Sequence, residues 1–297
     1  MSESVTRTAV TNHRLRIPET YNYIGVFLTM ACNLRCSFCI NRFGDADAKY
    51  PTLPGEDWVR GLNRIVSRAD LPVSLQGGEP SVHRDFYEII GGLREDLNID
   101  ILTNLQFDVD EFMSRVPPDR VKRDAPYASI RVSYHPETMA LEEIKGKVLR
   151  LLENGYSVGI WAVRYPPQLE EIERASEECR VAGIDFRFKE FLGYHGGELH
   201  GMYKYPDAFS GGRGEPVECR TTELLIGPSG HVYRCHGDLY NGRAPIGHIC
   251  DESFELEDIY RPCGYFGECN PCDVKIKTNR FQEFGHTSVD IRAAGEK

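Results

Sequence analysis

The sequence predicts an α/β fold: a partial (β/α)6 TIM-like barrel followed by a small C-terminal metal domain built from a β-hairpin and a helix. Two observations predict it. Strand-like and helix-like stretches alternate six times between residues 23 and 191, which is typical of a parallel sheet with right-handed crossovers. Six of the ten cysteines follow residue 218, and this density indicates metal ligands in the last part of the chain.

The expected strands are short runs rich in β-branched and aromatic residues. They cover residues 23–29, 72–75, 99–103, 128–133, 157–163 and 185–191. The expected helices have apolar residues at helical spacing, and they cover residues 55–68, 85–95, 109–116, 141–154 and 168–182. In a parallel barrel the functional face lies at the carboxyl ends of the strands, so the segments that follow the strands are expected to carry the site.

These elements divide the chain into five expected regions. They are an N-terminal arm (1–20), the barrel (21–192), a Gly-rich connector (193–218), a cysteine-rich domain (219–282) and a C-terminal tail (283–297). A connector of this length inside a compact protein is often functional, and we expect it to cover the mouth of the barrel.

Composition excludes several classes of protein. An apolar content of 41% with 27% charged residues is typical of a globular chain. The net charge of −10 disfavours a nucleic-acid partner, because phosphate binding normally requires a basic face. The first residues have no apolar segment typical of export, and no apolar run approaches the length of a membrane span. We therefore expect a cytoplasmic protein, in which cysteines are kept reduced.

The most specific motif is a triplet of cysteines directly after the first expected strand. Cys32, Cys36 and Cys39 have the spacing Cys-x3-Cys-x2-Cys. Three thiolates on one loop can hold three irons of a [4Fe–4S] cluster and leave the fourth iron open. Zinc is the competing interpretation, but structural zinc requires four closed N or S ligands, and no fourth Cys or His lies near this loop.

With Phe38 between its last two cysteines, this loop resembles the cluster-binding motif of the radical S-adenosylmethionine (SAM) superfamily. The resemblance spans roughly residues 20 to 282 and implies SAM as cofactor on the open iron. Reductive cleavage of SAM then gives a 5′-deoxyadenosyl radical that abstracts a substrate hydrogen. The segment Gly77-Gly78-Glu79-Pro80 resembles the family segment that holds the amino group of SAM, although a Gly-Gly pair is also common in ordinary turns.

Polar residues at the ends of later strands are candidates for contacts to SAM or substrate. Asn104 and Ser133 are expected near the SAM ribose, and helix or turn capping is their alternative role. Three residues are candidates for catalytic contact with substrate: Tyr134, Arg164 and Arg187. Arg187 and Lys189 alternate with phenylalanines in the sixth strand, so they face either an anion in the lumen or solvent. His135 precedes a proline, which predicts a surface histidine in a turn.

The second set of cysteines follows two patterns. Cys219-x10-Gly230-x4-Cys235 predicts a hairpin with a thiol at each base, and Cys263-x5-Cys269-x2-Cys272 closes the set. The patterns resemble SPASM and twitch domains, which carry auxiliary [4Fe–4S] clusters. The resemblance implies four ligands for a second cluster, namely Cys219, Cys235, Cys269 and Cys272.

Several alternatives remain open in this region. Cys263 is either a replacement ligand or a free thiol near the active site that donates a hydrogen atom. A zinc ribbon also fits two cysteine pairs. Cys179 and Cys250 are expected to be buried or incidental, because single cysteines usually behave as small hydrophobes.

The resemblance implies a radical SAM oxidoreductase that dehydrogenates or epimerises a small polar, sugar-like substrate, with the auxiliary cluster as electron acceptor. The compact cysteine arrangement is similar to that of 2-deoxy-scyllo-inosamine dehydrogenases. A reductant such as flavodoxin or ferredoxin is the expected partner. Maturation of a ribosomally made peptide is the alternative, disfavoured by the short N-terminal arm. A third hypothesis is a non-catalytic iron–sulfur or zinc protein.

Overall fold

The computed structural model describes residues 13–40, 51–212, 214–243, 245–277 and 285–295. Its centre is a nine-stranded sheet with the order β14-β13-β12-β2-β4-β5-β6-β7-β8. The six strands from β2 to β8 follow chain order and are parallel, so the predicted partial barrel is confirmed. They are β2 (Tyr23–Thr29), β4 (Val73–Gly77), β5 (Ile99–Thr103), β6 (Ile130–Tyr134), β7 (Val158–Arg164) and β8 (Phe186–Glu190).

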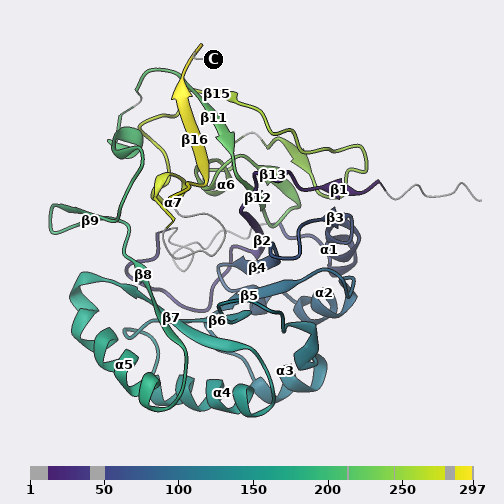
Figure 1. The fold of residues 1–297 in the computed structure, drawn as a ribbon, viewed down its shortest axis with the longest axis vertical. Coiled ribbons are helices and arrows are strands. Elements are labelled where there is room, and N and C mark those ends of the chain that lie inside the picture. Colours follow the sequence, from purple (N-terminus) through teal and green to yellow (C-terminus); the bar gives the residue numbers. More distant parts are fainter. Residues whose placement is uncertain (1–12, 41–50, 213, 244, 278–284, 296–297) are drawn as a thin grey trace, which may run out of the picture.

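Helices connect these strands, and Figure 1 shows α3, α4 and α5 along the outer face of the sheet. The helices are α1 (Gly55–Leu62), α2 (Phe86–Gly92), α3 (Val109–Arg115), α4 (Leu141–Glu153) and α5 (Leu169–Val181). α1 is shorter than predicted because the chain then enters β3 (Ile65–Val66), which pairs with β1 (Leu15–Arg16). The 310 turns are η2 (Pro80–Val82), η3 (Pro118–Arg120), η4 (Pro166–Gln168) and η5 (Pro206–Phe209). No helix in the described ranges is long and apolar enough to span a membrane.

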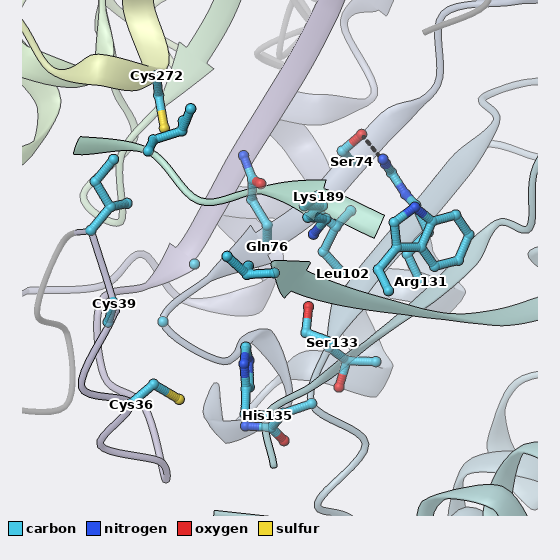
Figure 2. A pocket seen from close by; sticks show the side chains of 18 of the residues that line it. Cys36, Cys39, Ser74, Gln76, Leu102, Arg131, Ser133, His135, Lys189 and Cys272 are labelled. Atoms are coloured by element: carbon cyan, nitrogen blue, oxygen red, sulfur yellow. Dashed lines mark hydrogen bonds between the residues drawn. The ribbon is translucent and has the colours of Figure 1, made fainter. Parts of the chain in front are cut away.

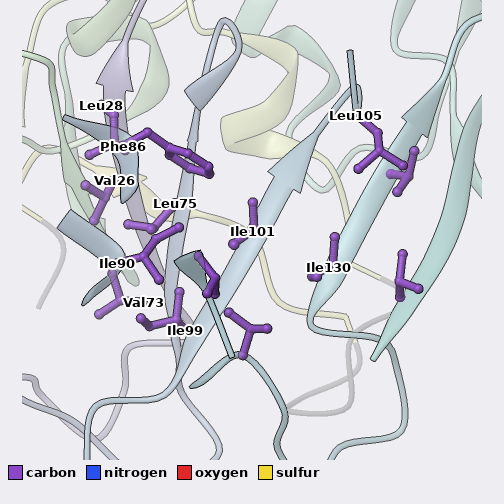
Figure 3. Close-up of a cluster of buried hydrophobic side chains, with 14 of the residues drawn as sticks. Val26, Leu28, Val73, Leu75, Phe86, Ile90, Ile99, Ile101, Leu105 and Ile130 are labelled. Atoms are coloured by element: carbon purple, nitrogen blue, oxygen red, sulfur yellow. The ribbon is translucent and has the colours of Figure 1, made fainter. Parts of the chain in front are cut away.

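The main core lies between the outer face of the sheet and the helices (Figure 3). In β4, Val73 and Leu75 are fully buried there, whereas Ser74 and Gln76 line the cavity inside the barrel. Successive side chains of a strand point to opposite faces. The apolar positions of each strand therefore build the core, and the positions between them line the lumen.

The C-terminal region continues the barrel sheet. β12 (Glu223–Ile226) pairs in parallel with β2, and β13 (His231–Tyr233) and β14 (Gly247–His248) extend the sheet beyond it. A hairpin forms between β12 and β13 around the predicted Gly230, which adopts a φ of 82°, but Cys219 does not lie at its base because it belongs to another strand. The four residues of β12 are all buried, so the C-terminal chain covers the edge of the first barrel strand.

A smaller sheet has the order β15-β11-β16, formed by β15 (Arg261–Cys263), β11 (Val217–Thr221) and β16 (Val289–Ala293). Sequence analysis expected a tail at residues 283–297, but Val289 and Ile291 alternate with charged residues and pair with β11. In the expected connector, β9 (Gly193–His195) and β10 (Glu198–His200) form a hairpin. Gly196 and Gly197 have φ values of 59° and 85°, which a two-residue hairpin turn requires. Short helices α6 (His236–Tyr240) and α7 (Pro271–Val274) complete the region.

Candidate active site

A cavity of about 480 Å³ opens inside the barrel toward the carboxyl ends of its strands. This volume lies within the range of small-molecule sites. Its lining includes many of the predicted residues: Cys32, Cys36, Phe38, Cys39, Gly77, Gly78, Glu79, Asn104, Ser133, Arg187 and Cys272. In Figure 2, Cys36 and Cys39 lie on one side of the cavity, and Arg131 with Ser74 lies on the other. The C-terminal region also contributes to the wall, through His236, Tyr240, Lys275 and Lys277.

The first three cysteines lie on the loop that follows β2, as predicted. Their thiols are close enough to affect one another: burial and the neighbouring Cys39, Glu137 and Cys32 raise the pKa of Cys36 to about 12. Burial also raises the pKa of Cys32. Such a group of thiols resists ionisation without a cation and is well suited to one, because metals bind the thiolate form. The donor set therefore fits a three-ligand iron–sulfur site.

Gly77 and Gly78 allow the start of this loop to pack against the end of β4. The amide of Gly78 donates to the carbonyl of Thr29, and the amide of Glu79 donates to that of Ala31, both at 2.9 Å. A Cβ atom at Gly78 would lie 2.3 Å from the Ala31 oxygen, and one at Gly77 would lie 2.1 Å from the Thr29 oxygen. Any larger residue would push the cysteine loop away, so both glycines are required for this approach.

Glu79 joins the ends of two neighbouring strands. Its carboxylate, only 1% exposed, accepts hydrogen bonds from Ser81, from the Thr103 hydroxyl at 2.8 Å and from the Asn104 amide at 2.7 Å. Burial raises its pKa, although these donors favour the charged form. The Asn104 side chain then donates to Asn33 of the cysteine loop at 2.7 Å. Glu79 and Asn104 thus position the loop in addition to lining the cavity, whereas Pro80 begins η2 and lies outside the lining.

The other side of the loop is held by the segment after β6. Glu137 accepts from the Ser37 amide at 2.6 Å and from the Ser37 hydroxyl at 2.7 Å. The Phe38 ring packs against His135 and Tyr165, with centroids 5.2 and 5.0 Å apart. These contacts fix the two residues between Cys36 and Cys39. Sequence analysis missed Glu137, because no local sequence pattern relates this residue to a loop 100 residues earlier.

His135 differs from its prediction as a surface histidine. It lines the cavity, and its Nδ1 is buried without a hydrogen-bond partner in the described chain. Burial, together with the positive charge of Lys189, lowers its pKa to about 4. The proline that follows does place it in a turn, but the turn folds over Phe38. His135 is therefore neutral at physiological pH.

The end of the cavity away from the cysteine loop, which we call the floor, is lined by Arg131. Arg131 belongs to a group of charged residues that sequence analysis missed. Asp100 is fully buried and binds two arginines, Arg123 at 2.8 Å and Arg131 at 3.1 Å. Both guanidinium groups lie over the ring of Tyr127. The signal was present in the sequence, since Asp100 and Arg131 are the single charged residues of β5 and β6. In a barrel such a position faces the lumen.

Four cysteines of the second set gather between the small sheet and α6. Cys219 shares a hydrogen bond with Cys263 and lies near Cys269 and Cys235. The shared hydrogen bond raises the pKa of Cys219 and lowers that of Cys263. Antiparallel pairing of β11 with β15 brings these two thiols together. The structure thus places Cys263, the alternative ligand of the sequence analysis, beside Cys219.

Cys272 instead lines the barrel cavity, whereas Cys263 does not. Burial raises the pKa of Cys272 to about 11, and the nearby Lys277 acts against this rise. Cys179 and Cys250 lie in or against the main core. In the described chain, no three Cys, His, Asp or Glu side chains converge as the ligands of a single metal ion would.

Comparison with known families decides the identity of the barrel. A family model described as "Radical SAM superfamily" matches residues 26–198, which cover the end of β2, the cysteine loop and the other five parallel strands. The chain belongs to the radical SAM superfamily. Membership implies SAM and one [4Fe–4S] cluster as cofactors, in agreement with the thiols of the first loop.

Relatives and solved structures agree with this assignment. GTP 3′,8-cyclase of Stenotrophomonas maltophilia (strain K279a) is 34% identical over 72 residues, 24% of this chain and 22% of that protein. The probable GTP 3′,8-cyclase of Pyrococcus abyssi is 39% identical over 70 residues, 23% of this chain and 22% of that protein. The matches thus span less than a quarter of these relatives. The structure of anSMEcpe with bound AdoMet and Cp18Cys peptide has the same fold, with a TM-score of 0.55, 12% identity and 93% coverage of each chain.

Two residues predicted to contact substrate in this radical SAM barrel lie outside its cavity. Tyr134 is 2% exposed in the main core, because it follows the lumen position Ser133 and so points to the helices. Arg164 follows the lumen position Val163, and it forms an ion pair with Glu173 at 2.9 Å on the outer surface. Arg187 does line the cavity, where it binds Asp185 at 2.9 Å. The predictions for Tyr134 and Arg164 were wrong, because successive side chains of a strand point to opposite faces of the sheet.

Proposed function

We propose that this radical SAM protein dehydrogenates or epimerises a small polar, sugar-like substrate inside the barrel. The observation that carries the proposal is the cavity itself, in which the three-cysteine loop faces a lumen that is lined by both apolar and charged side chains and is large enough for a small molecule. When bound, the cluster and SAM supply a hydrogen-abstracting radical, and the protein supplies position and protection from water. A reductant such as flavodoxin or ferredoxin would provide the electron.

The residues of the chain have separable roles in this proposal. Cys32, Cys36 and Cys39 hold the cluster. The loop is oriented by Glu79 and Asn104 on one side and by Glu137 on the other. Gly77, Gly78, Asn104 and Ser133, at the ends of β4, β5 and β6, offer backbone and polar groups to SAM, as the family resemblance implies. Arg187 reaches the lumen beside Trp161, 5.7 Å from its ring centroid, and contacts substrate.

A second [4Fe–4S] cluster in the C-terminal region would accept the electron that a substrate radical must lose to complete a two-electron oxidation. The grouping of Cys219, Cys235, Cys263 and Cys269 supports four thiolate ligands, which would leave no iron open. A closed cluster suits electron transfer. Cys272, on the wall of the substrate cavity, is then the thiol placed to donate a hydrogen atom in an epimerisation, the role that sequence analysis considered for Cys263.

The test is anaerobic incubation of the reconstituted protein with SAM and dithionite. We expect 5′-deoxyadenosine to form and about eight irons per chain, as two four-iron clusters require. Cys36→Ala should abolish 5′-deoxyadenosine and lower the iron content to about four per chain, because the open cluster loses a thiolate ligand. Cys179→Ala, which alters a cysteine of the core, is the matched control. Normal cleavage by Cys36→Ala would contradict the proposal.

A further inference from the structure

A buried group of charged side chains, of which Arg131 lines the barrel cavity, holds more positive than negative charge. Asp100 is the carboxylate of a buried group that also contains Arg123 and Arg131, and these three side chains are 0%, 5% and 15% exposed. Arg123 binds both oxygens of Asp100, at 2.8 and 3.0 Å. One carboxylate is thus already paired by one guanidinium, and Arg131 adds a second positive charge to the group. An uncompensated charge in a buried site is costly.

Arg131 has hydrogen-bond donors that are not used. Among the described residues its hydrogen bonds come from Nη2, which donates to Asp100 at 3.1 Å and to Ser74 at 3.3 Å. In the described part of the chain its Nε has no hydrogen-bond partner, and no hydrogen bond involves its Nη1. Arg131 lines the cavity, and Figure 2 shows its guanidinium beside Ser74, across from the cysteine loop.

The carboxylates that line the cavity are engaged elsewhere. Glu79 accepts from Ser81, Thr103 and Asn104 at the rim, and Glu190 pairs with Lys275 at 3.5 Å. Arg187 and Lys189 also line the cavity, at the neighbouring β8. Arg187 is paired with Asp185 at 2.9 Å and adds no net charge to the wall, so Arg131 supplies positive charge there even though the whole chain has a net charge of −10.

We infer that the cavity floor binds an anionic group of the substrate, a phosphate or a carboxylate, against the guanidinium of Arg131. This inference rests on the proposed function for the site, and it narrows the substrate to an anionic molecule. An arginine presents donors in a fork that matches phosphate and carboxylate geometry. Arg131 lies two residues below Ser133 on β6, about 7 Å deeper in the barrel. The anionic group would thus lie beneath SAM and orient the rest of the substrate toward the rim.

Binding of inorganic phosphate tests the floor directly. The reconstituted, SAM-loaded protein is titrated calorimetrically with phosphate at constant ionic strength. We expect wild type to bind, Arg131→Met to bind at least tenfold more weakly and Arg131→Lys to lie between them. Arg131→Met keeps the Asp100–Arg123 pair, so no buried carboxylate is left unpaired. Arg164→Gln, outside the cavity, is the matched control and should bind as wild type does.

A probe panel distinguishes the two kinds of anion. Glucose 6-phosphate and GTP carry phosphate, gluconate carries carboxylate, and glucose and glucosamine carry neither. Stronger binding of gluconate than of glucose 6-phosphate would assign a carboxylate, and the reverse would assign a phosphate. The inference is overturned if wild type binds no phosphate, if Arg131→Met binds it equally well, or if glucose or glucosamine binds more tightly than the anions.

Two further readouts separate this inference from the proposed function and from the SAM site. The SAM-induced change in the electron paramagnetic resonance spectrum of the reduced cluster should be the same in Arg131→Met as in wild type. Its loss would mean that Arg131 serves SAM and would overturn the inference. Phosphate binding without 5′-deoxyadenosine formation would uphold the anion site and reject the radical reaction, whereas the opposite result would reject the anion site alone.

Discussion

The two groups of cysteines are built in different ways. Cys32, Cys36 and Cys39 come from one loop, and side chains from the neighbouring strand ends hold that loop in place. The second group comes from segments between residues 219 and 269, and the pairing of β11 with β15 brings two of its members, Cys219 and Cys263, together. A site contained in one loop can be read from residue spacing. A site assembled across strands depends on pairing that spacing does not encode.

The largest expected effect distinguishes Cys263 from Cys272. Cys263→Ala should lose the iron of the second site, about four per chain, because a four-thiolate cluster loses a ligand. Cys272→Ala should keep this iron and still cleave SAM, since its thiol lies in the cavity. Iron and sulfide analysis of both purified variants is the measurement. Loss of iron from Cys272→Ala with retention in Cys263→Ala would restore the ligand set expected from the sequence.

A smaller effect compares the two carboxylates that hold the first loop. Glu79→Gln should lower the free energy of unfolding by about 2 kcal/mol, because an amide nitrogen would face buried donors that now bind an oxygen. Glu137→Gln is the matched control. Glu137 accepts its hydrogen bonds near solvent, and a glutamine there keeps an oxygen for Ser37. This substitution should lower the free energy of unfolding by less than about 0.5 kcal/mol. Urea unfolding measures both. Equal losses of unfolding free energy in the two variants would show that the burial of Glu79 does not set its contribution to stability.

The smallest effect concerns His135 and pH. Its pKa falls from 6.5 to about 4 on folding, so protonation favours the unfolded chain. Its contribution to stability is present above pH 6.5 and is lost as the pH falls toward 4. Between pH 7.5 and 5.5 wild type should lose about 1 kcal/mol more than His135→Gln. His13→Gln, at an exposed histidine, should behave as wild type, and a pH dependence unchanged in His135→Gln would disprove the burial argument.

The sequence predicted the barrel well because its signals are local. β2 and β5 begin and end at the predicted residues, since each is a short run rich in apolar residues between polar segments. Side chains at strand ends were harder to place. Tyr134 and Arg164 each lie one residue after a lumen position, and a shift of one residue reverses the face of a strand.

Other features depend on contacts between distant parts of the chain. Glu137 reaches Ser37, and β16 pairs with β11. Arg64 is 2% exposed because it binds the carbonyls of His13, Ile249 and Asp251, among others. None of these partners follows from residue spacing. The buried charges next to the cavity could have been predicted, because Asp100 and Arg131 are the single charged residues of β5 and β6.

The parallel pairing of β2 with β12 has a consequence for synthesis of the protein on the ribosome. β2 carries the cysteine loop, yet its free edge is covered only by Glu223–Ile226, nearly 200 residues later. Until that segment emerges, a fully apolar edge strand remains open to pairing with other nascent chains. Insertion of iron before this stage would take place on a protein whose sheet is still incomplete, so chaperone protection of that edge would determine the yield of loaded enzyme.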